Sequence, residues 1–272
     1  MTVASIENKK RPVNIGLALS GGGARGFAHL GVIKALNEHG VYPDIISGVS
    51  AGSVIGVLYS AGHSVEQILK MFEKHKATDL MELSIPKDGF FKMDGFKNVL
   101  NKNLKIKNLE QLPISTYVCA TDVVNGKPKI FKEGNIVERV SASCSIPIIF
   151  KPVKIDDSYY IDGGVLRNLP SWSIRGKCNF LIGVNCSPAA NYEYKNNIID
   201  IAQRSFDLMS KNNTMLDMKM CDILISTKSI AEHKTFDLTD IRKLCECGYK
   251  DACHVLDSIN IKELLETYFP HE

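Results

Sequence analysis

A serine flanked by glycines, Gly48-Val49-Ser50-Ala51-Gly52, lies where a short apolar stretch at 45–46 turns into a helical apolar pattern. A strand that turns abruptly into a helix at G-x-S-x-G is the setting of a nucleophilic serine. Gly48 and Gly52 allow the tight turn that lifts the Ser50 hydroxyl above the sheet. Ordinary strand-to-helix turns also match this pattern, so the prediction needs support from elsewhere in the chain.

A glycine-rich loop at 20–26 follows an apolar strand at 15–19 and precedes a helical pattern. Its letters G-x-G-x-x-G, starting at Gly21, are typical of a dinucleotide site at a helix N-terminus. Such a site requires an acidic residue about 20 positions further on, at the carboxyl end of the second strand. Asp44 precedes that strand and Ser50 follows it, which disfavours a nucleotide.

The same loop is better suited to an oxyanion hole. Consecutive glycines expose backbone N–H groups that can converge on a developing negative oxygen. The residues expected to form and brace this hole are Gly21, Gly22, Gly23, Arg25 and Gly26. Arg25 would hold the loop by donating to its carbonyls. A solvated arginine at a helix start, the alternative, would oppose the helix dipole.

Downstream, Tyr159-Tyr160-Ile161 reads as a short strand that ends in Asp162-Gly163-Gly164. An aspartate before two glycines is usually a turn former. In a chain that also carries a serine elbow, however, Asp162 becomes the candidate base, because a serine hydroxyl needs a group that takes its proton.

A catalytic histidine is not expected. Three histidines follow Asp162, and none of them ends a strand or meets a glycine turn: His233, His254 and His271. The usual order of a Ser-Asp-His triad would require one there. We therefore predict a Ser50–Asp162 dyad and interpret His29 and His63 as structural.

The elements that would position these residues alternate along the chain. Strands are expected at 13–19, 44–48, 116–120, 128–132, 159–162, 180–185 and 222–226. Helices are expected at 26–38, 51–61, 65–75, 198–219 and 239–257. Alternation of this kind predicts a mostly parallel sheet covered by helices.

Composition agrees with one sizeable enzyme domain and argues against nucleic acid as a partner. The chain has 272 residues, of which 44% are hydrophobic, and a net charge of +3. This length can bury a full core, whereas the small charge does not favour nucleic acid. The start lacks a signal peptide, and no stretch of about 18 apolar residues occurs, so a cytoplasmic location is expected.

The eight cysteines show no disulfide framework and are expected to be reduced thiols. Cys245, Cys247, Cys253 and His254 cluster in sequence, but helical register places Cys245 in the core and Cys247 elsewhere, so no metal site is predicted. An aromatic stretch, 90–93 with Phe96, is a candidate lid or entry for an acyl chain in the loop-rich segment 84–97; packing into the core is the alternative.

The motifs G-G-G-x-R-G, G-x-S-x-G and D-G-G, in this order and spacing, resemble those of the patatin-like phospholipases. The resemblance covers 15–58, the stretch 117–122 and the region up to about Asn185, and thins beyond it. The chain is most similar to short bacterial stand-alone members related to the catalytic domain of neuropathy target esterase. Their glycine loop is followed by Ala-His-x-Gly-Val, here residues 28–32.

This resemblance implies a three-layer α/β/α patatin-like fold with a mostly parallel central sheet, built from one catalytic domain at 13–272 after an N-terminal tail at 1–12. It implies that Ser50 is the nucleophile, that Asp162 is the proton acceptor and that 21–26 form the oxyanion loop. Neither a cofactor nor a catalytic metal ion is implied.

The implied function is hydrolysis of a lipid ester, a phospholipid or lysophospholipid, through an acyl-serine intermediate. The lipid substrate would draw the enzyme into transient, peripheral contact with a membrane surface. Two alternatives stay open: an acyltransferase that uses the same acyl-serine, and a catalytically silent lipid-binding scaffold. Related acyl-carrier transferases use a histidine partner, so the absence of a well-placed histidine favours hydrolysis.

Overall fold

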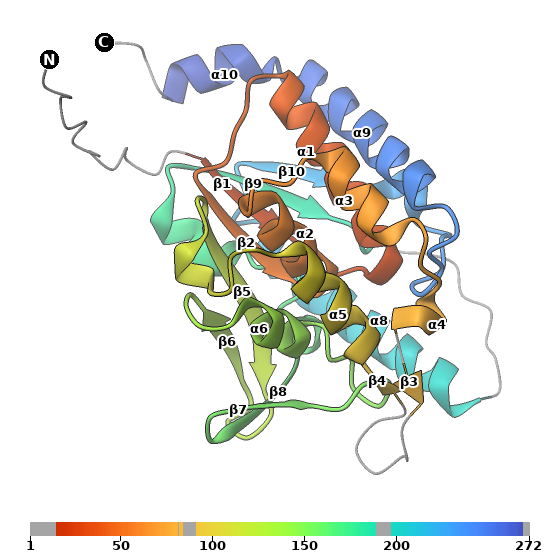
Figure 1. Cartoon of the computed structure of the whole chain (residues 1–272). Helices are drawn as coiled ribbons and strands as arrows, with labels where there is room; N and C mark the ends of the chain where they lie inside the picture. The colour runs from red at the N-terminus through yellow and green to blue at the C-terminus, as the bar shows by residue number, and fades with distance from the viewer. Residues whose placement is uncertain (1–14, 81, 84–90, 189–196, 269–272) are drawn as a thin grey trace, which may run out of the picture.

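An eight-stranded central sheet runs through the molecule, with helices on both of its faces (Figure 1). The computed structural model describes residues 15–80, 82–83, 91–188 and 197–268. The strand order is β10-β9-β1-β2-β5-β8-β7, and β6 also pairs with β5. The strands are β1 (Ile15–Leu19), β2 (Ile45–Val49), β5 (Ser115–Asp122), β6 (Lys127–Phe131), β7 (Val153–Ile155), β8 (Ser158–Asp162), β9 (Phe180–Asn185) and β10 (Ile223–Ser226). A separate antiparallel pair joins β3 (Glu82–Leu83) to β4 (Phe91–Lys92).

The sheet is parallel from β10 to β5 and antiparallel beyond it. The pairings β10–β9, β9–β1, β1–β2 and β2–β5 are parallel. The pairings of β5 with β6 and β8, and of β7 with β8, are antiparallel. The predicted α/β/α fold with a mostly parallel sheet is thus confirmed.

Side chains alternate between the two faces of β1. Leu17 and Leu19 belong to the main core, whereas Ala18 packs into a smaller core on the opposite face with Ile45 and Leu181. Successive residues of a strand point to opposite faces, so a strand covered by helices on both sides reads as a continuous apolar run. The sequence of β1, Ile-Gly-Leu-Ala-Leu, follows this rule.

The main core lies between the sheet and the helices α1, α2, α3, α6 and α9, and the smaller one lies under α7 and the end of α8. The helices are α1 (Ala28–Glu38), α2 (Ala51–Ser60), α3 (Val65–Phe72), α4 (Ala77–Leu80), α5 (Asp94–Asn103), α6 (Ile136–Ser143), α7 (Ser171–Ile174), α8 (Ile198–Met218), α9 (Ile241–Ser258) and α10 (Ile261–Tyr268). Within the described ranges, no helix has the length and apolar character needed to cross a membrane.

Two glycines let α1 and α9 pack with their backbones in contact. A Cβ on Gly31 would lie 1.8 Å from the carbonyl oxygen of Cys245, and one on Gly248 would lie 2.2 Å from that of Ala28. Cys245 is buried at this crossing and Cys247 is only half-buried, as the helical register predicted. Among the described residues, no three metal-binding side chains gather in one place.

The structure corrects several predicted boundaries. The expected helix at 26–38 is a 3₁₀ helix at Gly23–Phe27 followed by α1. Half of the expected loop at 84–97 falls in β4 and in the first turn of α5, and residues 84–90 lie outside the described residues. The short strand β7, which makes a hairpin with β8, was not expected. The predicted tail at 1–12 also lies outside the described residues.

Strand register brings the three motifs to one level of the sheet. Leu19, the last residue of β1, pairs with Gly48, and Val49 pairs with Cys119. Because β8 runs antiparallel to β5, Asp162 returns to pair with Ala120, one residue beyond Cys119. The glycine loop, the serine elbow and the aspartate therefore leave neighbouring strands at nearly the same height.

Candidate active site

Ser50 lies on a strained turn between β2 and α2. Its backbone has φ 51° and ψ −124°, a conformation that residues with a side chain rarely adopt. A Cβ on Gly48 would lie 2.4 Å from the carbonyl oxygen of Gly52, and one on Gly52 would lie 2.2 Å from that of Leu19. Only glycine fits at either position, which explains the G-x-S-x-G spacing.

Ser143 fixes this turn from the neighbouring helix α6. The Ser50 N–H donates to Ser143 Oγ at 2.8 Å, and Ser143 Oγ donates to the carbonyl oxygen of Cys119 at 2.6 Å. All three residues are buried. The elbow N–H is therefore occupied and cannot serve as an oxyanion donor.

Replacing Ser143 by alanine should destabilise the protein, because it leaves a buried donor and a buried acceptor without partners, at a cost of about 1–3 kcal/mol each. Ser141 is the matched control, since it is equally buried on α6 but its hydroxyl has no hydrogen-bond partner in the described chain. We expect Ser141→Ala to be neutral or stabilising. Urea unfolding of both variants measures the difference, and equal effects would contradict this role of Ser143.

Asp162 caps the turn that follows β8 and is fully buried. Its Oδ1 accepts a hydrogen bond from the Gly164 N–H at 2.8 Å. Its Oδ2 accepts no hydrogen bond within the described residues. A Cβ on Gly163 would lie 2.7 Å from the carbonyl oxygen of Cys119, so the first glycine of the D-G-G motif lets the turn press against β5.

Burial raises the pKa of Asp162 to about 7. The Ser50 hydroxyl and the Gly164 N–H act in the opposite direction, but both effects are smaller than that of burial. Burial dominates because the charged form loses its hydration. The structure therefore places beside Ser50 a carboxyl group that takes up a proton near neutral pH.

The glycine loop leaves two donors unused. The Gly21 N–H donates to the carbonyl oxygen of Asn168 at 3.2 Å, and the Ala24 N–H donates to that of Thr235 at 2.7 Å. Among the described residues, no acceptor faces the N–H groups of Gly22 and Gly23. Of the loop N–H groups expected to form the oxyanion hole, only those of Gly22 and Gly23 therefore remain as candidates. The Gly21 N–H is already bonded to Asn168.

Gly23 and Gly26 are glycines for different reasons. Gly23 has φ 57°, and a Cβ there would lie 2.3 Å from the Thr235 carbonyl oxygen. A Cβ on Gly26 would lie 2.4 Å from the Cβ of Ala51. The loop is therefore pressed against the start of α2, next to Ser50.

Arg25 is buried behind the loop. Its guanidinium donates to the carbonyl oxygen of Gly22 and to Thr235 Oγ1, each at 3.4 Å, and lies 3.9 Å from Asp207. Burial lowers its pKa, and the Asp207 carboxylate opposes that shift. These contacts are those expected of a side chain that braces the loop.

Among the described residues, no histidine lines a cavity that Ser50 lines. His29 is fully buried and its Nε2 lies 2.8 Å from the Ser20 carbonyl oxygen; burial lowers its pKa to about 4. The rings of His63 and His233 bond the carbonyl oxygens of Asn103 and Asp237. His254 is exposed on α9, and His271 lies outside the described residues.

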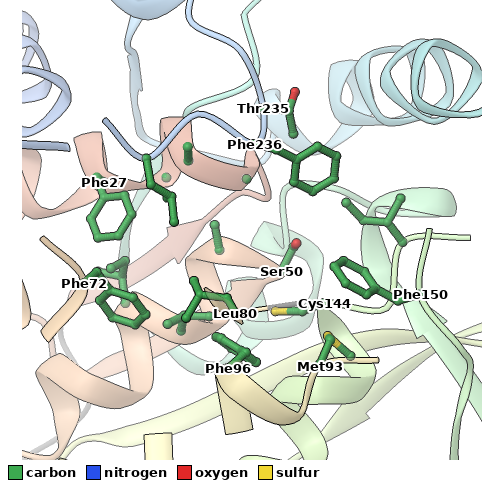
Figure 2. A pocket seen from close by; sticks show the side chains of 18 residues that line it. Phe27, Ser50, Phe72, Leu80, Met93, Phe96, Cys144, Phe150, Thr235 and Phe236 are labelled. Carbon is green, nitrogen blue, oxygen red and sulfur yellow. The ribbon is translucent and has the colours of Figure 1, made fainter. Parts of the chain in front are cut away.

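Ser50 lines two cavities that differ in polarity. One, of about 150 Å³, is apolar and contains no charged side chain in its lining. Figure 2 shows the Ser50 hydroxyl surrounded by Phe27, Phe72, Phe96, Phe150 and Phe236. The other, a polar cavity of about 60 Å³, contains the charged side chains of Arg25, Arg204, Asp207 and Lys211 in its lining, alongside apolar ones such as Ile146, Phe206 and Leu208.

The aromatic segment that was a candidate lid contributes in part. Met93 and Phe96 line the apolar cavity (Figure 2), while Phe91 packs elsewhere, beside Phe150. Phe90 lies outside the described residues. The two contributing side chains come from the start of α5, a helix that the sequence analysis did not predict.

The sequence analysis also missed Asn168 and Ser143. Asn168 is buried and lines the polar cavity together with Ser50, and its Nδ2 donates no hydrogen bond within the described chain. It follows the D-G-G turn by four residues, and nothing in the sequence distinguished it from an ordinary loop asparagine. Ser143 carried no signal, because its role depends on packing between α6 and the elbow.

Comparisons with known proteins agree with this geometry. A family model described as patatin-like phospholipase matches residues 17–173, a range that contains the glycine loop, Ser50 and Asp162. An uncharacterized NTE family protein of Mycobacterium tuberculosis is 35% identical over 164 residues, which cover 60% of this chain and 46% of the relative. Lysophospholipase NTE1 of Scheffersomyces stipitis is 29% identical over 182 residues, covering 64% of this chain and 12% of the relative.

Solved structures show the same fold. VipD from Legionella pneumophila aligns with a TM-score of 0.62 and 17% identity, over 91% of this chain and 67% of VipD. Human GIVD cytosolic phospholipase A2 aligns with a TM-score of 0.53 and 12% identity, over 96% of this chain and 60% of the other. At such low identities the likeness concerns the fold alone.

Proposed function

Because the chain belongs to the patatin-like phospholipase family, we propose that it is a serine lipid acyl hydrolase with Ser50 as nucleophile and Asp162 as base. The observation that carries this proposal is the position of Ser50. It lies on a strained elbow, at the junction of an apolar and a polar cavity, beside a buried carboxyl group.

The acylation step uses Ser50 and Asp162. Asp162, in its ionised form, takes the proton of the Ser50 hydroxyl as the oxygen attacks the ester carbonyl. A carboxyl group with a pKa of about 7 is a far better base at neutral pH than an ordinary aspartate. The proton then passes from Asp162 to the leaving alcohol, and an acyl-serine remains.

The negative oxygen of the tetrahedral intermediate is held by the Gly22 and Gly23 N–H groups, which have no other acceptor in the described chain. Ser50 is the N-cap of α2, so the positive end of the helix dipole also stabilises the negative oxygen. Asn168 lines the same cavity as Ser50, and its Nδ2, which donates no hydrogen bond within the described residues, is a further donor for the substrate. Water activated by Asp162 then releases the fatty acid.

The rate should depend on pH through Asp162. Since its pKa is raised to about 7, the base is protonated and inactive below that pH and ionised above it. We expect kcat/KM to fall tenfold per pH unit below about pH 7 and to level off above it. A soluble ester substrate assayed from pH 5 to 9 gives this profile, whereas a flat profile down to pH 5 would contradict the assigned base.

The apolar cavity is the proposed site of the acyl chain, because its lining is aromatic and aliphatic and uncharged. A relative is named a lysophospholipase, and we propose a single-chain phospholipid as the substrate here too. The alignment spans less than half of each of these longer relatives. Their other activities are not transferred to this chain.

Hydrolysis is distinguished from the alternatives by product analysis. Release of free fatty acid from a lysophospholipid, unchanged by added alcohol or thiol acceptors, supports a hydrolase. Transfer of the acyl group to an acceptor would show an acyltransferase. A folded protein that binds the lipid but releases nothing would be a silent scaffold. The lack of a histidine at either described cavity favours the first result.

A further inference from the structure

The proposed oxyanion donors have no side chains of their own to hold them in place. The Gly22 N–H belongs to the peptide unit between Gly21 and Gly22, and the Gly23 N–H belongs to the next peptide unit. A peptide unit between two glycines rotates with little steric resistance, because neither residue has a Cβ. The loop therefore needs contacts from other residues that fix the direction of each N–H.

The direction of each donor can be fixed through the carbonyl group of the same peptide unit. A trans peptide is planar, so its C=O and N–H bonds point in opposite directions. No peptide bond of the described residues is cis. A hydrogen bond to the Gly21 carbonyl oxygen thus fixes the direction of the Gly22 N–H, and one to the Gly22 carbonyl oxygen fixes that of the Gly23 N–H.

Both of these carbonyl groups are held in the structure. Ser20 Oγ donates to the Gly21 carbonyl oxygen at 2.9 Å, and Ser187 Oγ donates to the same oxygen at 2.8 Å. The Gly22 carbonyl oxygen accepts from the Arg25 guanidinium at 3.4 Å. The N–H groups of the same two peptide units meet no acceptor in the described chain. Donors that are fixed and unoccupied before the reaction are what an oxyanion hole requires.

Ser187 reaches the glycine loop from the end of β9. It lies beside the loop because β9 pairs in parallel with β1, the strand that leads into the loop. The Ser187 N–H donates to Asn185 Oδ1 at 3.0 Å, and Pro188 follows, which restricts the backbone of the residue before it. Ser187 is half-buried and lines the polar cavity together with Ser50. Its hydroxyl is therefore presented to the loop from a fixed backbone.

We infer that Ser187 is a positioning residue whose hydroxyl, together with that of Ser20, directs the Gly22 N–H at the negative oxygen of the tetrahedral intermediate. This inference rests on the proposed hydrolase function and adds a residue to its mechanism. Ser20 is fully buried and its Oγ also accepts the Cys186 N–H at 2.9 Å, so its removal would leave that N–H without a partner. Ser187 Oγ makes no other hydrogen bond within the described residues, so Ser187→Ala removes this contact alone.

Oxyanion donors act on the transition state more than on the bound substrate, so the inference predicts that kcat and KM respond differently. We expect Ser187→Ala to lower kcat on a soluble ester about tenfold and to change KM less than about twofold. The loss is smaller than the roughly 10²–10³-fold expected for a deleted donor, because Ser20 still holds the carbonyl group. Ser187→Thr keeps the hydroxyl and should retain kcat within about twofold of the wild type.

Ser258→Ala is the matched control. It also removes a serine hydroxyl that donates to a backbone carbonyl oxygen, that of Val255, at 2.7 Å. Ser258 is exposed and lines neither of the cavities at Ser50. Its substitution should change neither kcat nor KM.

Two inhibitors with the same alkyl chain separate the oxyanion from the rest of the site: a trifluoromethyl ketone and the corresponding alcohol. The ketone carbon bonds to the Ser50 oxygen, the ketone oxygen takes the electron pair of its double bond, and Asp162 takes the serine proton. The alcohol forms no such adduct. We expect Ser187→Ala to raise the Ki of the ketone about tenfold and to leave that of the alcohol within about twofold.

An unchanged kcat in Ser187→Ala, an equal loss in Ser187→Thr, or equal changes in Ki for the ketone and the alcohol would overturn the inference and leave the hydrolase intact. A loss that appears in KM alone would show that Ser187 contacts the substrate and would overturn it too. A wild type that hydrolyses no ester and forms no ketone adduct would overturn the proposed function, and the inference with it.

Discussion

Replacing Asp162 by asparagine is expected to abolish most activity and at the same time to stabilise the fold. Asparagine keeps the shape of the side chain and can still accept the Gly164 N–H, but it cannot take a proton from Ser50. Loss of a general base lowers kcat by about 10²–10⁴-fold. Ester hydrolysis at pH 8 measures this loss, and a variant that keeps more than a tenth of wild-type kcat would contradict the role of Asp162.

The stabilisation follows from the direction of the pKa shift. The pKa of Asp162 is raised from 3.8 to about 7 by burial, so the folded state holds its proton more tightly than the unfolded state does. The cost of the buried charge is absent below pH 3.8, grows from there and is complete above about pH 7. At 1.36 kcal/mol per pKa unit this cost is about 4 kcal/mol at most, so Asp162→Asn should gain about 2–4 kcal/mol at pH 8 and little at pH 4.

Asp122 supplies the matched control, since it lies on the neighbouring strand with the opposite shift. Hydrogen bonds from Asn125 lower its pKa to about 2, with smaller contributions from Ser158 and Val124. Its charge therefore stabilises the fold above pH 4, and Asp122→Asn should be destabilising at pH 8. Urea unfolding of both variants at pH 8 compares them. A destabilised Asp162→Asn would show that the buried carboxylate has a partner that the geometry does not reveal.

Substitution of Ser50 is expected to have the largest effect on activity. Without the hydroxyl no acyl-serine forms, and Ser50→Ala or Ser50→Gly should lose about 10⁴-fold or more in kcat. The two variants should differ in stability, because glycine relieves the positive φ of 51° and alanine does not. We expect Ser50→Gly to be about 1 kcal/mol more stable than Ser50→Ala.

Kinetic assays with a soluble ester measure the loss of kcat, and urea unfolding at one pH measures the difference in stability between the two variants. Residual activity above 1% in either variant, with wild-type contamination excluded by mass, would show that another group attacks the ester. Equal stability of the two variants would show that the backbone of the elbow relaxes when the serine is removed.

The sequence predicted the parts of the site that depend on local rules. Gly48 and Gly52 are dictated by contacts within a few residues of Ser50 or with the next strand, and the apolar runs around them define β2 and α2. The same holds for Gly23, whose positive φ only glycine adopts freely. At these three positions the backbone leaves room for glycine alone.

Other parts depend on tertiary structure and carried no local signal. The pairing of β8 with β5, which brings Asp162 level with the elbow, follows from the antiparallel turn of the sheet. Ser143 is one serine among several on α6, and only packing distinguishes it from Ser141. The proposed oxyanion donors, the N–H groups of Gly22 and Gly23, could be singled out only once it was known which carbonyl oxygens in the described chain accept the other N–H groups of the loop.

Which side of α8 faces the candidate active site could not be predicted, for a similar reason. The sequence predicted the helix almost to the residue, at 198–219 against Ile198–Met218. Which of its faces meets the D-G-G turn depends on Phe206, Ser210 and Asn213 reaching Gly164 from far along the chain. Periodicity shows that a helix has two faces, and only the fold shows what each of them contacts.

The most direct test of the nucleophile is the intact mass of the purified protein after reaction with a fluorophosphonate. We predict one adduct per wild-type chain, mapped by peptide analysis to Ser50, no adduct on Ser50→Ala, and much slower labelling of Asp162→Asn. A folded wild type that stays unlabelled while it hydrolyses esters, or an adduct that persists on Ser50→Ala, would contradict the assignment of Ser50 as the nucleophile.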